Sequence, residues 1–324
     1  MKASNFKLAP LAVAALTASA GLSLSGSAQA EAYAISYNNI FNFQVTQAPV
    51  GSVEFLFPNT VASNTSATLS GFAGCANAAQ GSLADATACN LNVAKAQNDF
   101  TAVGNVGGDY SRSDSQVVSE QVNLVTFAQA VNIAESRVGG QGQAAAGSNV
   151  ASDTTFNIPF LVSGPSSLTF AFNADPYLQV VLLDSPMPPS VARASLDASI
   201  TIINNTTGLE VFSWAPNGAA GGITGGTENT DGANLNATIV RNFGSNGTTT
   251  LDQTGNGAAD VGDLTPSTFA SFNAITNLLG NGNYTLTLRF GQRTEVTRVP
   301  EPGVLALLGL GLTGLALARR RKQA

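Results

Sequence analysis

Apolar and polar residues alternate in most segments between residues 155 and 290. Segments 156–162, 167–172, 191–202 and 284–290 place apolar side chains at about every second position, which is the period of a strand that buries one face. Segment 209–214 follows after the residues NNTTG, which suit a hairpin turn. The pattern therefore predicts a series of antiparallel strands.

The pattern before residue 155 is less regular. Segments 34–37, 40–45 and 53–57 have the composition of short strands, while the alanine-rich stretch 73–98 is typical of a loop with one helical turn near its end. Residues 117–138 fit both helical and strand spacing, and the surrounding strands favour two strands there.

Two features depart from plain strands. Pro159 lies inside an alternating segment, which predicts an edge strand or a bulge because proline has no N–H to donate. Phe269, Phe272, Ile275 and Leu278 are spaced by three, which predicts one short helix.

Taken together, these elements predict a mainly β fold. We expect an antiparallel β-sandwich of jelly-roll type over residues 31–299, with a less regular N-terminal lobe. The segment 139–148, rich in glycine, glutamine and alanine, is the predicted internal hinge.

Residues 1–30 have the three parts of a secretory signal peptide. Lys2 and Lys7 accompany the start of an apolar stretch that runs from residue 8 to 24, and Ala28 and Ala30 supply the small residues of a cleavage site. We expect cleavage after Ala30 and export of the rest of the chain.

The segment 300–324 is built from three blocks. Pro300, Glu301 and Pro302 form a rigid polar motif, the uncharged run 303–318 is sixteen residues long, and Arg319, Arg320, Arg321 and Lys322 follow. Sixteen residues make a helix of about 24 Å, slightly shorter than a bilayer core of about 30 Å, and snorkelling or local thinning closes such a gap. We predict a transmembrane helix over 303–318 with the basic cluster as a cytoplasmic stop.

This tail resembles the PEP-CTERM sorting signal of Gram-negative bacteria that make exopolysaccharide. The resemblance rests on Pro300, Glu301 and Pro302, on the glycine- and leucine-rich span and on the terminal arginines. It implies recognition by exosortase, an inner-membrane cysteine enzyme, and a transient inner-membrane anchor before delivery to the cell surface or extracellular matrix. Gly303 directly after the motif is a departure that bears on the cut position.

The charge balance changes once the targeting segments are set aside. Six of the 14 Lys and Arg residues lie in those segments, so eight remain against 20 acidic residues and give a net charge of about −12. Such an acidic domain repels nucleic acid, which we exclude as a partner.

Cys75 and Cys89 both lie in the exported part, where disulfides persist. We expect a disulfide between them, and two free thiols or a redox or metal pair are the alternatives. Because the chain has no histidine, a zinc site would need more cysteines than it contains.

Residues 252–264 have a spacing similar to the calcium loop of EF-hand and dockerin modules. Gly257 stands at position 6, and position 12 is an aspartate where the family has a bidentate glutamate, so calcium would bind only at about millimolar affinity. The alternative is an ordinary polar turn, which the same residue types also favour. Beyond this calcium ion we expect no cofactor. The candidate ligands are Asp252, Thr254, Asn256, Asp260 and Asp263.

The catalytic inventory is small, since the absence of histidine excludes Ser-His-Asp and Cys-His sites. We therefore expect a non-catalytic surface or matrix protein in adhesion, biofilm or exopolysaccharide-associated structure, with exopolysaccharide or other surface proteins as partners. One alternative is a carbohydrate-binding module, which exposed aromatic residues such as Trp214 on one sheet face would favour. The other is a secreted glycan-active enzyme with two carboxylates across a cleft.

Overall fold

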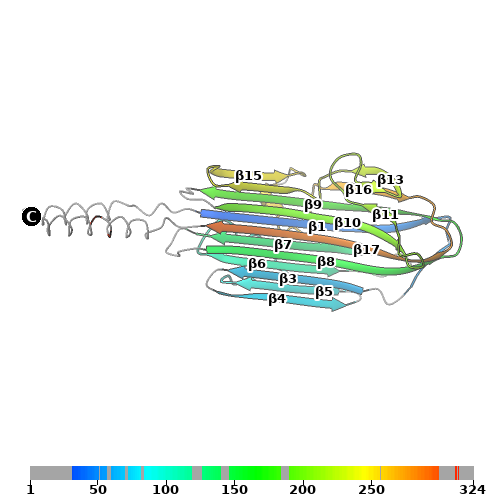
Figure 1. Ribbon diagram of the computed structural model, residues 1–324, viewed down its shortest axis with the longest axis horizontal. Helices are drawn as coiled ribbons and strands as arrows, with labels where there is room; N and C mark the ends of the chain where they lie inside the picture. The colour runs from blue at the N-terminus through cyan, green and yellow to red at the C-terminus, as the bar shows by residue number, and fades with distance from the viewer. Residues whose placement is uncertain are drawn as a thin grey trace, which may run out of the picture.

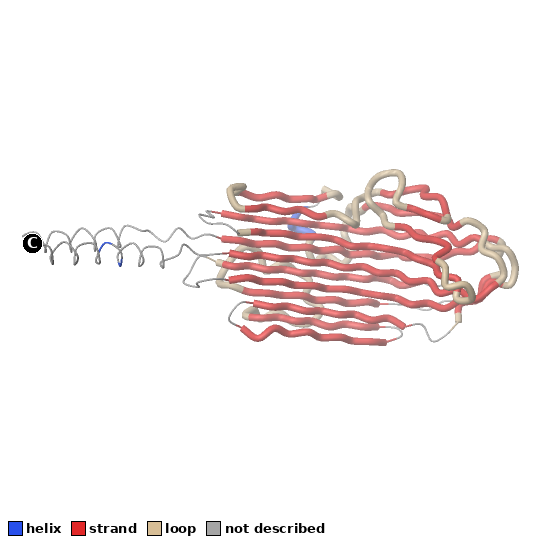
Figure 2. The backbone as a smooth tube through the Cα atoms, in the orientation of Figure 1, coloured by secondary structure: helices blue, strands red, loops and turns tan. Residues whose placement is uncertain are grey.

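Two antiparallel sheets make up the protein, and most strands run along its long axis (Figure 1). The computed structural model describes residues 31–50, 52–56, 60–69, 72–81, 84–118, 126–139, 146–183, 190–255 and 257–298, together with Gly311 and Thr313. Strands dominate these residues, and loops lie mainly at the strand ends (Figure 2). The prediction of a mainly β, antiparallel fold is confirmed.

Sheet A has eight strands, and its long central strand comes from the start of the described chain. β15 pairs with the part of β9 that β16 leaves open. In spatial order the strands are β13 (Gly226–Asp231), β16 (Ala270–Thr276), β9 (Ser167–Leu183), β1 (Glu31–Ala48), β7 (Thr126–Val138), β6 (Tyr110–Val118) and β5 (Ala84–Leu91), with β15 (Gly247–Asp252) beside β9.

Sheet B has nine strands, and its centre is formed by β10, β17 and β8. In spatial order the strands are β12 (Ile223–Thr224), β11 (Glu210–Trp214), β10 (Val191–Asn204), β17 (Gly282–Arg298), β8 (Ala146–Val162), β3 (Thr60–Leu69) and β4 (Phe72–Gly81), with β14 (Thr238–Asn242) beside β10 and β2 (Val53–Phe55) beside β8. The predicted hairpin between β10 and β11 is present.

Aromatic side chains fill one part of the space between the sheets. Phe172 of β9 stacks on Phe272 of β16 with ring centroids 4.6 Å apart, and Phe160 of β8 stacks on Tyr284 of β17 at 5.3 Å. Burial of such rings supplies a large share of the hydrophobic stabilisation. These are the inward positions of the alternating segments in the sequence.

Small polar side chains fill the space between β6, β7, β8 and β17. Thr154 Oγ1 donates to Asn132 Oδ1 at 2.9 Å and lies 3.0 Å from Ser115 Oγ, while Asn132 Nδ2 donates to the carbonyl of Phe290 at 3.2 Å. These bonds satisfy groups that would otherwise be costly to bury. The interior here is therefore polar and lacks the apolar alternation that marks a strand in sequence.

This polar interior explains why the prediction of a less regular N-terminal lobe is wrong. β1 lies between β9 and β7 in sheet A, and β3 pairs with β8 in sheet B, so N-terminal and C-terminal strands share both sheets. The stretch 73–98, predicted as a loop, contains most of β4 and all of β5. In the predicted hinge 139–148, residues 140–145 lie outside the described residues, and 146–148 belong to β8.

Two local predictions are also corrected. The segment predicted as a helix from Phe269 to Leu278 contains strand β16 instead. Phe269 and Leu278 flank this strand and are both exposed, so spacing by three did not mark a buried helical face. Pro159 is in the interior strand β8, at the point where its neighbour changes from β3 to β2. The missing N–H therefore falls where the partner strand is interrupted.

Candidate functional site

Both ends of the described domain lie at one end of the sandwich, which we call the chain-end pole. β1 starts at Glu31 and β17 ends at Arg298, and both ends lie on the same side in Figure 1. Ala32 and Val296 belong to one buried cluster that joins the two sheets. Residues 299–324 therefore continue the chain from the same end of the sandwich at which β1 begins.

A disulfide joins the two sheets along one side edge. Cys75 of β4 is bonded to Cys89 of β5, with their Cα atoms 6.0 Å apart. β4 belongs to sheet B and β5 to sheet A, and Cys89 is buried against Ala67 and Ala134. The prediction of this disulfide is confirmed.

Residues 92–109 form a loop that covers part of the outer face of sheet A. Phe100 of this loop is buried together with Tyr33 and Tyr37 of β1 and Ile133 of β7. We call residues 92–109 the cover loop. The cover loop adds a second buried layer on this face of sheet A and shields the face from solvent.

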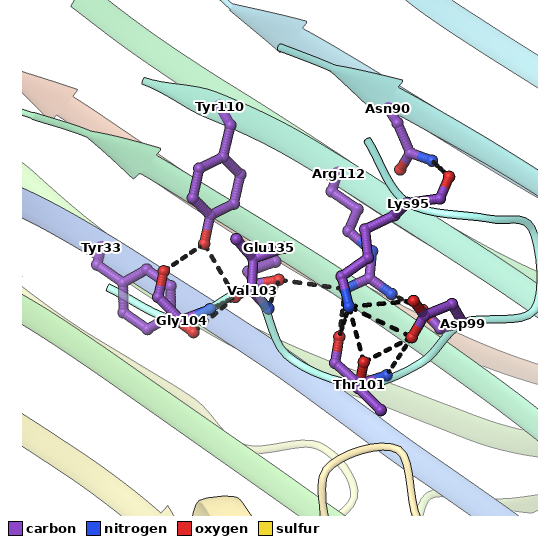
Figure 3. A network of polar contacts seen from close by, with 10 residues as sticks. All are labelled: Tyr33, Asn90, Lys95, Asp99, Thr101, Val103, Gly104, Tyr110, Arg112 and Glu135. Carbon is purple, nitrogen blue, oxygen red and sulfur yellow. Dashed lines mark hydrogen bonds and ion pairs between the residues drawn. The ribbon is translucent and has the colours of Figure 1, made fainter. Parts of the chain in front are cut away.

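The carboxylate of Glu135, on β7, holds the cover loop against sheet A (Figure 3). It accepts backbone N–H bonds from Val103 at 3.0 Å and Gly104 at 2.7 Å, and hydroxyl bonds from Tyr33 at 2.8 Å and Tyr110 at 2.9 Å. Burial, reinforced by the negative charge of Glu135, raises the pKa of both tyrosines, so they remain proton donors.

Arg112 of β6 contacts the same loop. Its Nη1 lies 3.4 Å from Glu135 Oε2 and donates to the carbonyl of Thr101 at 2.7 Å, and its Nη2 donates to the carbonyl of Asp99. At the edge of the loop Lys95 donates to Asp99 at 3.2 Å, and a hydrogen bond from Thr101 lowers the pKa of Asp99. This network has the features of a structural clamp.

The outer face of sheet B carries a different group of charges, and four of them lie around Gly291 of β17. Arg289 Nη2 is 3.8 Å from Asp153 Oδ1 of β8 and 3.6 Å from Asp197 Oδ2 of β10, and Arg293 Nη2 is 3.7 Å from Asp153 Oδ1. Burial raises the pKa of Asp153, and the two arginines oppose that rise. The sequence does not reveal this group because its charges come from three separate strands, β8, β10 and β17, at outward positions otherwise rich in Ser and Thr.

Trp214 does not lie on an exposed sheet face. Its side chain is fully buried in the core, with its ring centroid 5.8 Å from that of Phe172, and its indole N–H donates to Glu228 Oε1 at 2.7 Å. The exposed tryptophan expected of a carbohydrate-binding module is therefore absent at this position.

The candidate calcium loop follows β15. The Asp252 carboxylate accepts backbone N–H bonds from Gly255 at 2.8 Å and Gly257 at 2.6 Å, and Asp263 Oδ1 accepts one from Thr265 at 2.8 Å. These contacts are typical of polar turns.

A buried carboxylate lies beside this loop. Thr254 Oγ1 donates to Asp175 Oδ1 at 2.6 Å, and burial raises the Asp175 pKa to about 6, with Asp260 and Asp252 adding to the rise. Asn256 lies outside the described residues. Within the ranges that the structure describes, no three His, Cys, Asp or Glu side chains are grouped so that they could hold a metal ion.

The remaining predicted sites lie outside the described residues. They are the cleavage residues Ala28 and Ala30, the motif Pro300, Glu301 and Pro302, most of the helix 303–318, and the basic cluster Arg319, Arg320, Arg321 and Lys322. In the described part of the chain, no helix has the length and apolar character needed to cross a membrane.

Comparison with known proteins bears on the tail. Residues 298–322 match the family described as the PEP-CTERM protein-sorting motif. The protein is therefore a PEP-CTERM sorting domain-containing protein, and the motif implies export, a transient membrane-anchored sorting tail and processing by exosortase.

Two further comparisons cover the whole chain. None of the curated proteins matches the chain. One solved structure, of the infectious bursal disease virus Gx strain, aligns with 91% of this chain and 89% of its own at 11% identity and a TM-score of 0.11. That similarity is too low to support any statement about fold or function.

Proposed function

We propose that this protein is a non-catalytic component of the cell surface or extracellular matrix of a Gram-negative bacterium. In this proposal its signal peptide directs export, exosortase removes the tail, and the β-sandwich acts in adhesion, biofilm or exopolysaccharide-associated structure. The observation that carries the proposal is the sorting motif at residues 298–322, which begins at the last residue of β17.

The shape of the domain supports this role. Because both chain ends lie at the chain-end pole, a membrane-held precursor would present the far end of the sandwich and the outer face of sheet B to its surroundings. The disulfide between the sheets adds stability suited to an oxidising exterior. These features favour a rigid display domain.

The alternative of a glycan-active enzyme is less well supported than that of a glycan-binding protein. Asp153 and Asp197 flank one strand, so their Cα atoms are about 10 Å apart by strand spacing. The guanidinium of Arg289 lies within 4 Å of both carboxylates, in the space that an attacking water and a sugar would need. The arrangement favours recognition over hydrolysis.

A fractionation experiment tests the proposal. The native host is compared with an exosortase deletion, and the protein is followed in inner membrane, outer surface and medium. We expect surface or matrix protein only when exosortase is present, and its retention in the inner membrane otherwise. The same distribution in both strains would contradict the sorting role.

A further inference from the structure

We propose that the outer face of sheet B binds a neutral polysaccharide chain laid across its strands. The inference rests on the proposed surface role and adds to it a class of ligand and the residues that would recognise it. It is based on the charges around Gly291. These charges take no part in holding the cover loop and are not part of the sorting tail.

Five residues of this face lie side by side in one cross-strand row. The register pairs Ala78 with Asn64, Asn64 with Asp153, Asp153 with Gly291, and Gly291 with Asp197. We call these residues the Asp row. With strands about 4.8 Å apart the row spans about 19 Å, enough for an extended chain of several rings.

The row is hollow where a ligand would need room. A Cβ atom on Gly291 would lie 2.5 Å from Asp153 Oδ1, so glycine at this position lets the Asp153 carboxylate lie over β17. On the other side of Asp153 is a pocket of about 210 Å³, smaller than the sites of about 300–1,000 Å³ that hold drug-sized ligands. It is lined by Asn64, Thr65, Ser66, Ala76, Asn77, Ala78 and Asp153.

The charged groups retain capacity for a ligand. All three Arg–Asp contacts are 3.6–3.8 Å long, and Asp153 Oδ1 has no hydrogen-bond partner within the described residues. Solvent reaches the side chains, since Arg293 is 52% exposed and Asp197 46%. Each can therefore exchange a long ion-pair contact for a shorter bond to a ligand.

The charge balance selects the kind of ligand. Two carboxylates and two guanidiniums cancel, so an anionic ligand would meet Asp153 and Asp197, and a cationic ligand would meet Arg289 and Arg293. A hydroxyl group both donates and accepts, and it suits carboxylate, guanidinium and the Asn64 amide equally. A neutral chain of sugars carries such hydroxyls along its whole length.

Native electrophoresis of the purified full chain tests this inference, in a detergent without a sugar headgroup. The gels contain dextran, galactomannan or hydroxyethyl cellulose as neutral probes, and alginate as the anionic probe. We expect at least one neutral polysaccharide to retard the protein and alginate to have no such effect.

Two substitutions and a matched control locate the site. Gly291→Ala, which displaces the Asp153 carboxylate, and Asp197→Asn, at an exposed position, should each weaken retardation about tenfold, the effect of one lost charge-assisted hydrogen bond. Gly280→Ala has no neighbouring atom within 4 Å and should leave binding unchanged. Circular dichroism confirms that each variant is folded.

The inference is overturned if no neutral polysaccharide retards the protein, or if both variants bind as the wild type does. Equal retardation by alginate would also overturn it. None of these results affects exosortase processing, which the fractionation experiment follows separately. Failure of the ligand assignment and failure of the sorting role are therefore distinguishable.

Discussion

Arg112 and Glu135 form an ion pair in which both side chains are fully buried, with Nη1 and Oε2 3.4 Å apart. The pair lies between β6, β7 and the cover loop, and Glu135 also accepts four hydrogen bonds from tyrosines and backbone amides. Taking two charges out of water is costly, and only this full set of partners offsets that cost. The pair thus fixes the cover loop onto sheet A.

Replacing one member should destabilise the protein strongly. We expect Glu135→Gln to lower the free energy of unfolding by about 3–5 kcal/mol, because the buried Arg112 loses its ion-pair partner. Urea unfolding measures the loss, and limited proteolysis should show faster cutting between residues 92 and 109. Glu54→Gln, at an exposed position of β2, is the control and should change stability by less than about 0.5 kcal/mol. A loss for Glu135→Gln no larger than that of the control would contradict the clamp.

Asp114 should make the stability of the protein depend on pH. Its side chain is fully buried, and burial raises its pKa to about 6 despite the opposing effects of the nearby Arg112 and of the backbone N–H groups of Asn98, Ser115 and Asp99. The unfolded chain has an ordinary aspartate pKa of about 3.9, so the native state binds more protons between the two values. Stability should therefore fall as pH rises from about 4 to about 6.

The variant Asp114→Asn has no proton to lose and should remove this part of the pH dependence. We expect it to be more stable than the wild type at pH 7 by about 2 kcal/mol and similar to it at pH 4. Thermal unfolding across this range makes the comparison. The idea fails if the difference between the two proteins does not change with pH.

The disulfide should contribute measurably to stability. Cys75 and Cys89 are separated by 14 positions, and closing a loop of this length stabilises a protein by about 3 kcal/mol in the chain-entropy account. We expect the double variant Cys75→Ala/Cys89→Ala to lose about that much in urea unfolding, and reductant to have the same effect on the wild type. Equal unfolding midpoints for oxidised and reduced protein would contradict this prediction, because they would show that β4 and β5 are held together without the disulfide.

Asp252 should act through the loop backbone. Because its carboxylate accepts N–H bonds from Gly255 and Gly257, Asp252→Ala should lower stability by about 1–3 kcal/mol, to the same extent in calcium and in chelator. Calorimetry with millimolar calcium should give no binding heat. Heat seen in the wild type and lost in the variant would instead support the calcium loop.

The sequence predicted the fold best where apolar alternation is strong. β10, β11 and β17 were found because residues such as Ile200 and Leu286 are buried at every second position. β5 and β6 were missed because their inward residues include Ser113, Ser115 and Thr87, whose hydroxyl groups bond across the interior. Serine and threonine are equally common in loops, so the sequence alone does not distinguish such a strand from a loop. Only packing against the opposite sheet does.

The candidate sites were likewise predictable only where the sequence itself brings their residues together. The disulfide and the tail were readable because each lies within a short segment. The Asp row was not, because Asn64, Asp153, Asp197 and Gly291 come from four strands and meet only through sheet register. The sequence does not place Trp214 in the core, because a strand's pattern does not say which face is covered.

The most direct test of the account is the intact mass of the mature protein from its native host, with and without exosortase. We expect a chain that starts at Glu31 and lacks the residues after Pro302 when exosortase is present, and a chain that keeps its tail when exosortase is absent. A tail that remains intact in both strains would mean that residues 303–318 are a permanent anchor, which would contradict delivery of the β-sandwich to the surface.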